Sequence, residues 1–145
     1  MLRFYIIVLT LLTSAWALAY PNYGQQWPHR SVIYFAPTQD KHVEQFKLDT
    51  LLNDCALTDR DVITIIITQD GYTKPDWVEK QFDLAALFSL YRVNPNEHTA
   101  ILIGKDGAEK MRWGKRIDWK KVKQAIDNIP QRQREMKNKQ DPCSI

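Results

Sequence analysis

The sequence predicts an α/β fold of the order β-α-β-α-β-β-α, a three-layer sandwich with a mixed central sheet. Residues 31–35 (SVIYF) are β-branched and aromatic, which indicates a strand, and an Ala-Pro-Thr break follows them. Residues 61–68 (DVITIIIT) are apolar on both alternating faces, as in a strand that helices cover on both sides. Residues 105–107 (KDG) form a tight turn between two short strands.

Length and composition limit the possible classes of protein. The 145 residues leave room for one domain, and 44% hydrophobic with 26% charged residues is typical of a globular chain. A net charge of +3 does not mark a nucleic-acid-binding protein, and we expect no nucleic-acid partner. Two cysteines exclude a disulfide-dense mini-domain and a four-cysteine zinc site.

The first residues have the three-part plan of a secretory signal peptide. One positive charge at Arg3 precedes an apolar run over residues 4–12, and residues 17–19 (ALA) form a small-x-small cleavage site. The alternative is a membrane anchor, but Thr10, Thr13 and Ser14 interrupt a run that should extend over about 20 residues. We therefore expect a signal peptide at 1–19, no span after its cleavage, and secretion across the cytoplasmic membrane into the periplasm.

The first half of the chain then divides into an arm, a strand, a helix and a second strand. Residues 20–30 are a lead-in arm, and Thr38 or Asp40 can cap a helix that runs to about residue 53. Its apolar positions step at helical spacing. They are Val43, Phe46, Leu51, Leu52 and Cys55.

The second half supplies two more helices and a hairpin. A helix opens at Pro75 or Asp83 and ends near Arg92, and strands follow over residues 99–103 and 108–113. Asp118 caps a last helix that Pro130 ends, so the domain spans 31–130 and a basic tail spans 131–145. Because helical crossovers join the first three strands, we expect these strands to be parallel, with the fourth antiparallel to the third.

Four segments together carry a resemblance to a known family. They are residues 31–37 (SVIYFAP), 57–68 (LTDRDVITIIIT), 101–111 (ILIGKDGAEKM) and 125–136 (AIDNIPQRQREM). In these segments the chain resembles a bacterial family of small secreted thioredoxin- and peroxiredoxin-like proteins of unassigned function. The domain is also similar to repeats in vertebrate sushi-repeat and related matrix proteins. The resemblance implies a thioredoxin-like fold in an extracytoplasmic setting and no established reaction.

The residues that thioredoxin-type redox chemistry needs are missing. Such a site places a low-pKa thiolate at the N-terminus of the first helix. Here that position reads PTQDKH over residues 37–42, and the peroxiredoxin register falls near Glu44. The position of the superfamily's cis-proline falls on Thr99, next to His98. We therefore expect no redox catalysis, and we assign no catalytic residue and no cofactor.

The two cysteines lie far apart in the sequence. Cys55 is at the far end of the first helix, and Cys143 lies beyond the last helix, which in the predicted plan runs the same way across the same face. A Cys55–Cys143 disulfide and two inert thiols are both open. His29, His42 and His98 have no paired spacing with each other or with cysteine, and we expect no metal site.

Charge is distributed unevenly. Residues 20–104 carry 7 basic and 11 acidic side chains, whereas residues 105–145 carry 12 basic and 6 acidic ones. This basic third is either a solvated surface or a contact for an anionic component of the cell envelope. The predicted basic surface consists of Lys115, Arg116, Lys120, Lys121, Lys123, Arg132 and Arg134.

These observations predict an exported, non-catalytic binding or adaptor module. Its contact site is the cleft where the superfamily has its active site, with free N–H groups at the helix N-terminus that an anion or a peptide backbone could bind. The predicted cleft residues are Thr38, Gln39 and Asp40, with His98 and Thr99 opposite. The alternatives are a diverged thiol oxidoreductase, or another enzyme in the same cleft, and a binder of anionic envelope surfaces. The partner is an unknown protein or an anionic envelope component, and the sequence leaves the oligomeric state open.

Overall fold

The computed structural model describes residues 27–138 and Cys143. The predicted signal peptide, residues 20–26 of the arm and most of the chain after residue 138 lie outside the described residues. No helix among the described residues is long and apolar enough to cross a membrane. The strands are β1 (Arg30–Ala36), β2 (Val62–Thr68), β3 (Thr73–Lys74), β4 (Thr99–Ile103) and β5 (Glu109–Trp113). The helices are α1 (Lys41–Leu52), α2 (Asp54–Asp59), α3 (Trp77–Gln81), α4 (Leu84–Leu90), α5 (Trp119–Asp127) and α6 (Pro130–Asn138).

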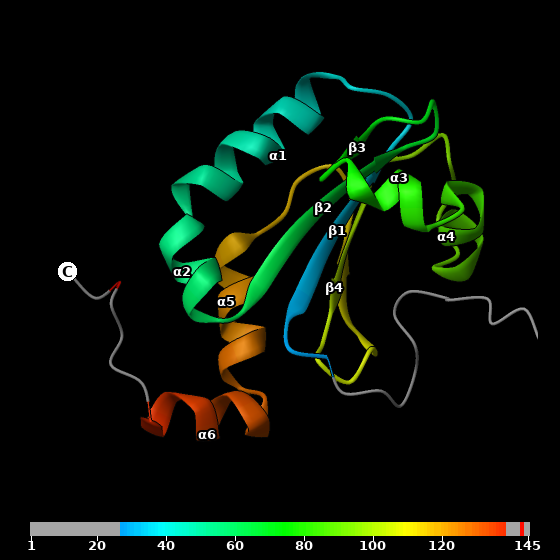
Figure 1. Cartoon of the computed structure of the whole chain (residues 1–145). Coiled ribbons are helices and arrows are strands. Elements are labelled where there is room, and N and C mark those ends of the chain that lie inside the picture. Colours follow the sequence, from blue (N-terminus) through cyan, green and yellow to red (C-terminus); the bar gives the residue numbers. More distant parts are fainter. Residues whose placement is uncertain (1–26, 139–142, 144–145) are drawn as a thin grey trace, which may run out of the picture.

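The strands form one mixed sheet in the order β3-β2-β1-β4-β5 (Figure 1). The α/β class, the mixed sheet and the helical layers are confirmed. β1 is central, and all seven of its residues are buried. β2, which the sequence predicts as a covered strand, lies inside the sheet between β1 and β3.

The predicted direction of the third long strand is wrong. β1 and β2 are parallel, but β4 pairs antiparallel with β1, with Thr99 opposite Phe35. The expectation rests on the rule for crossover connections, in which a helix joins one strand to a parallel strand of the same sheet. Here β2 first turns back into the short β3, and two short helices follow. The chain therefore enters β4 at the end of the sheet where β1 ends.

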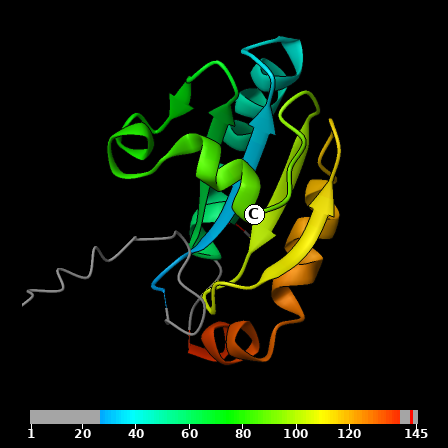
Figure 2. The ribbon, with the colours of Figure 1, turned by 90° about the vertical axis from the view of Figure 1, so that its right-hand side faces the viewer.

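Helices cover both faces of the sheet (Figures 1 and 2). Side chains of α1, α2 and α5 pack with Tyr34 and Ile66 on one face, whereas those of α3 and α4 pack with Phe35 and Ile67 on the other. Alternate residues of β1 and β2 thus belong to two separate cores, as the period of two in these runs predicts.

The first predicted helix is confirmed as α1, and Asp40 is its N-cap. Val43 and Phe46 face the core, whereas Leu51 and Leu52 are 72% and 76% exposed. The helix carries two apolar stripes at helical spacing, and only the stripe that includes Val43 and Phe46 contacts the sheet. The helix ends at Asn53, and α2 continues from there with Leu57 buried.

The predicted second helix is divided. Phe82 is extended between α3 and α4, and the Asp83 side chain accepts hydrogen bonds from the first turn of α4. Of the two predicted starting points, Asp83 is therefore the cap of the second piece. Leu87, Phe88 and Tyr91 are buried against the sheet.

The last predicted helix is α5, and Asp118 caps it as predicted. The segment after it is not a solvated tail throughout, because residues from Pro130 to Asn138 form α6 across the lower end of the sheet (Figure 1). Proline is well tolerated at the first position of a helix, where its missing N–H has no intrahelical partner. Pro130 therefore begins a helix as well as ending the previous one.

Ion pairs attach α6 to the lower end of the sheet. Glu135 of α6 lies 3.2 Å from Arg30 and 2.8 Å from Lys105, and Lys105 also lies 2.9 Å from Asp61. Arg30 is 1% exposed, so its charge requires a partner in the protein interior. Glu135 supplies that partner from a sequence distance of 105 residues.

A second set of ion pairs holds the start of α6 against α2 and α5. Arg132, of which 2% is exposed, lies 2.7 Å from Asp59 and 3.4 Å from Asp127, and Arg60 lies 2.8 Å from Asp127. The two sets contain four basic and four acidic side chains, so the charges of this cluster balance.

Of the two alternatives that the sequence leaves open for the cysteines, the structure has the disulfide: Cys55 and Cys143 are joined, with a Cα–Cα distance of 5.8 Å. It joins α2 to the end of the chain, across a sequence separation of 88 residues. A bridge of this span restricts the unfolded chain strongly, since the stabilisation grows with the length of the closed loop.

We predict that the double variant Cys55→Ser, Cys143→Ser is less stable to urea than the oxidised protein by roughly 2–4 kcal/mol. Thiol titration of the folded, unreduced protein should find no free cysteine. Reductant should lower the stability of the wild type to that of the variant and leave the variant unchanged. Two titratable thiols in the untreated protein would contradict the disulfide.

We predict that Glu135→Gln destabilises the protein by roughly 2–3 kcal/mol at neutral pH, because it leaves the buried Arg30 without its carboxylate. Burial raises the pKa of Glu135, but Lys105 and Arg30 outweigh it and hold the pKa below its ordinary value of 4.5. A lowered pKa stabilises the fold above the unfolded value and ceases to do so as the pH falls through the folded value.

The difference in unfolding free energy between wild type and Glu135→Gln should therefore shrink as the pH falls below 4.5. Glu109→Gln is the matched control, since Glu109 pairs with Arg112 and both side chains are more than a third exposed. It should cost less than about 1 kcal/mol. Equal effects of the two variants would contradict the structural role of Glu135.

Candidate ligand-binding site

Asp40 organises the end of the sheet where β1 stops and α1 begins. Its Oδ1 accepts hydrogen bonds from the backbone N–H groups of His42 and Val43, at 3.0 and 3.1 Å. Its Oδ2 lies 2.6 Å from Nε2 of His98, which immediately precedes β4. One carboxylate therefore caps the helix and holds an imidazole from a distant segment of the chain.

The charge of Asp40 matters for what can bind here. Burial raises the pKa of its carboxyl, but the hydrogen bonds from Val43, His98 and His42 outweigh burial and lower the pKa below its ordinary value. The carboxylate is thus ionised at neutral pH. It already occupies the N–H groups of His42 and Val43, so the predicted docking of an external anion on these groups is not supported.

The other predicted cleft residues lie at the same end of the sheet and differ in their surroundings. Thr38 is exposed and donates a hydrogen bond to Asp70 at 2.8 Å, and Gln39 is exposed. Thr99 is half-buried in register with Phe35. The structure therefore brings Asp40 and His98 into contact, whereas Thr38 is bonded to the turn that follows β2.

The first turn of α1 contains no sulfur atom. Cys55 and Cys143 are joined to each other, and Cys55 lies in α2, beyond the opposite end of α1. The cis peptide bond found in the described residues is Lys74–Pro75, not the bond before Thr99. Within the described residues, no group of three or more His, Cys, Asp or Glu side chains is placed to hold a metal ion.

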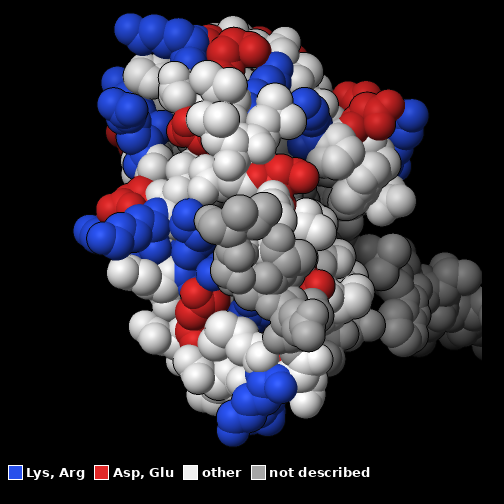
Figure 3. Space-filling view, turned by 90° about the vertical axis from the view of Figure 1, so that its left-hand side faces the viewer, with Lys and Arg blue, Asp and Glu red and all other residues white. Residues whose placement is uncertain are grey.

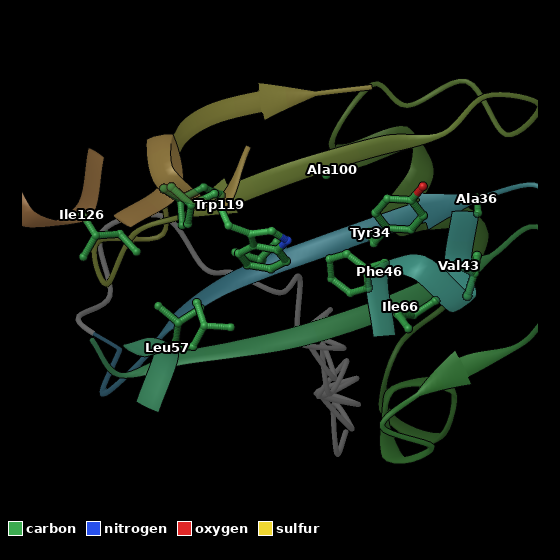
Figure 4. Close-up of a cluster of buried hydrophobic side chains, with 13 residues drawn as sticks. Tyr34, Ala36, Val43, Phe46, Leu57, Ile66, Ala100, Trp119 and Ile126 are labelled. Carbon is green, nitrogen blue, oxygen red and sulfur yellow. The ribbon is translucent and has the colours of Figure 1, made fainter. Parts of the chain in front are cut away.

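A cavity of about 270 Å³ opens along one side of α1 from Lys41 to Asp49, beginning directly after the Asp40 cap. Its floor contains Tyr34 and Phe46, whose rings stack at 4.7 Å, and Trp119 lies 5.7 Å beyond Phe46 (Figure 4). The Tyr34 hydroxyl donates to the carbonyl oxygen of Lys115 at 2.8 Å, and burial raises its pKa, so it stays neutral. We call this the α1 cavity. It is lined by Tyr34, Lys41, His42, Gln45, Phe46, Asp49, Lys115, Arg116 and Ile117.

The family model for a domain of unknown function, DUF4174, matches residues 23–135. The chain belongs to this family. No curated protein matches it. The matched range of the DUF4174 domain extends from before β1 to Glu135 and therefore includes most of α6. The helix that pairs with Arg30 and Lys105 is thus part of the domain.

The predicted basic surface of this DUF4174 domain is only partly exposed. Lys115, Arg116, Lys120, Lys121 and Arg134 are exposed. Lys123 is half-buried and donates to Asn53. The prediction that Arg132 belongs to this surface is wrong, because its guanidinium is buried between Asp59 and Asp127. On the face that Figure 3 shows, basic and acidic side chains are interspersed, and several of the basic ones lie along the left edge of the view.

Sequence reasoning missed the α1 cavity. Tyr34 and Phe46 read as core residues of a strand and a helix, and both are indeed buried. The signal that could have located the cavity is the adjacent pair Lys115-Arg116, which lies just before the helix that begins at Trp119. Its proximity to α1 depends on tertiary packing, which the local sequence does not contain.

We predict that Asp40→Ala lowers the free energy of unfolding by about 1–2 kcal/mol, because the helix loses its cap and His98 loses its partner. Asp118→Ala is the matched control, since Asp118 caps α5 through Lys121 N–H. It should cost less than Asp40→Ala. The excess at Asp40 should disappear in a His98→Ala background, as measured by urea unfolding. An excess that persists there would contradict the coupling between Asp40 and His98.

Proposed function

We propose that this domain is an exported binding module without thiol redox activity, and that its ligand binds in the α1 cavity. The observation that carries the proposal is the replacement at the N-terminus of α1. In a thioredoxin-like fold this position would hold a reactive thiolate, and here it holds Asp40, engaged by the helix and by His98. The fold retains a cavity next to this position and lacks the nucleophile.

Export is supported by two independent features. Disulfides persist mainly in oxidising compartments, and Cys55 and Cys143 are joined in this chain. The signal-peptide pattern over residues 1–19 predicts the same route. We therefore propose the periplasm as the place where the domain works.

The pair Asp40–His98 also has the form of an oriented base, which is the strongest argument for an enzyme. A general base must reach the proton that it removes. The His98 side chain is only 9% exposed, its Nε2 contacts Asp40, and its ring packs edge-on against His42 at 4.9 Å. These contacts favour a structural role for the pair in linking α1 to β4.

We predict that the wild-type protein shows no peroxide or disulfide reductase turnover above that of the variant Cys55→Ser, Cys143→Ser. Both proteins should be assayed folded, with a thioredoxin-type reducing system as electron donor and an active thiol oxidoreductase as positive control. Cysteine-dependent turnover in the wild type would overturn the proposal and favour a diverged thiol oxidoreductase.

A further inference from the structure

We infer that the α1 cavity binds a small organic anion that joins a carboxylate or phosphate group to a single flat apolar ring, an inference that rests on the proposed binding function. Three basic side chains line the cavity, Lys41, Lys115 and Arg116. None of the three forms an ion pair within residues 27–138. Their charges are therefore available to a ligand.

The single carboxylate in the lining does not cancel this positive charge. Asp49 accepts a hydrogen bond from the side-chain amide of Gln45 at 2.8 Å, within the same helix. Three cations against one anion leave the cavity with an excess of positive charge. Arg116 adds specificity, because a guanidinium can form two parallel hydrogen bonds to a carboxylate or a phosphate.

The apolar part of the recognition lies at the rim of the cavity. Tyr34 and Phe46 are 1% and 4% exposed, so their stacked rings support the cavity from the core and offer a ligand almost no surface. The apolar surface that a ligand can reach is Ile117, which is half-buried, and the alkyl stems of Lys41 and Lys115. A flat apolar ring can pack on Ile117 and on such stems while the charged ends of the stems reach its anionic group.

The size of the cavity restricts the ligand further. A volume of about 270 Å³ is slightly below the roughly 300–1,000 Å³ of typical small-molecule pockets. A single-ring anion fits this volume better than a folded polymer or a helix. The second cavity, about 370 Å³ beside α4, differs in having Arg92 as its one charged lining residue.

The test uses the purified, oxidised chain and five probes: phenyl phosphate, benzoate, benzyl alcohol, benzylamine and inorganic phosphate. Binding is followed by the shifts of the backbone amide signals in ¹H–¹⁵N NMR spectra. We expect phenyl phosphate and benzoate to shift the amides of His42, Arg116 and Ile117. Benzyl alcohol and inorganic phosphate should each bind at least tenfold more weakly, because each lacks one half of the recognition, and benzylamine should not bind.

Variants separate the cavity from the general basic surface. The double variant Lys115→Gln, Arg116→Gln should weaken phenyl phosphate binding about tenfold, as expected for the loss of two nearby charges. The matched control Lys120→Gln, Lys121→Gln removes two exposed charges of α5 that do not line the cavity, and it should change the affinity less than twofold. Asp49→Asn should tighten binding about two- to fivefold, because it removes the one negative charge of the lining.

Three results would overturn the inference: binding of benzylamine as tight as that of phenyl phosphate, equal losses in the two double variants, or no amide shift around the cavity with any probe. All these variants are at exposed or half-buried positions, and urea unfolding is used to check that each one folds. The outcome is separable from that of the reductase assay. Cysteine-dependent turnover would refute the binding-only proposal, whereas loss of charge selectivity would refute the anion and leave a binding module.

Discussion

The antiparallel pairing of β1 and β4 is the constraint on which the candidate site depends. Because Thr99 lies opposite Phe35, the residue before β4 arrives where β1 ends and α1 begins. This is why His98 reaches the Asp40 carboxylate across 58 residues of sequence. In a parallel pairing the start of β4 would face the start of β1, about 20 Å away at roughly 3.3 Å per residue. Asp40 would then cap its helix alone, and no ring would link the helix to the sheet.

The two ends of the sheet are stabilised in different ways, and this difference is why we propose a ligand at the upper end. At the lower end Arg30 is buried inside the central strand, and the fold must bring a carboxylate to it. Glu135 does so, which makes α6 part of the domain and explains why a very polar segment is ordered. Burying a charge is costly unless it is paired, so the lower end tolerates little change. At the upper end Asp40 and His98 satisfy each other, and the neighbouring cations Lys41, Lys115 and Arg116 have no such partners in residues 27–138.

Local signals in the sequence predicted those features that have a local physical cause. The alternation in residues 61–68 placed Ile65 and Ile66 in opposite cores, and the side chains of Asp40 and Asp118 cap the helices that they precede. Other features could not be predicted, because the local sequence permits two arrangements equally well and only tertiary packing selects one of them. Both stripes of α1 have helical spacing, and only packing exposes Leu51. Pro130 is equally compatible with the end of one helix and the beginning of another. The direction of β4 depends on the turn of the chain into β3, and a strand of two residues is too short to be recognised in a sequence. The resemblance to thioredoxin-like proteins placed Asp40 opposite His98 correctly, although the strand directions inferred from the crossovers would have separated them.

The distribution of paired and unpaired charges says more about binding than the net charge of +3 does. Arg132 and Arg116 are both basic residues of the C-terminal third, and the sequence placed them in one surface. Arg132 is neutralised by Asp59 inside the protein and has no capacity left for a partner. Arg116 lines a cavity whose own carboxylate is already hydrogen-bonded to Gln45. A charge contributes to recognition when the fold leaves it near an apolar surface and without a counter-ion, because the ligand then supplies both the missing charge and the missing contact. In the α1 cavity the unpaired side chains of Lys41, Lys115 and Arg116 lie beside the half-buried Ile117, which is why we propose the binding function there and not at the capped helix end.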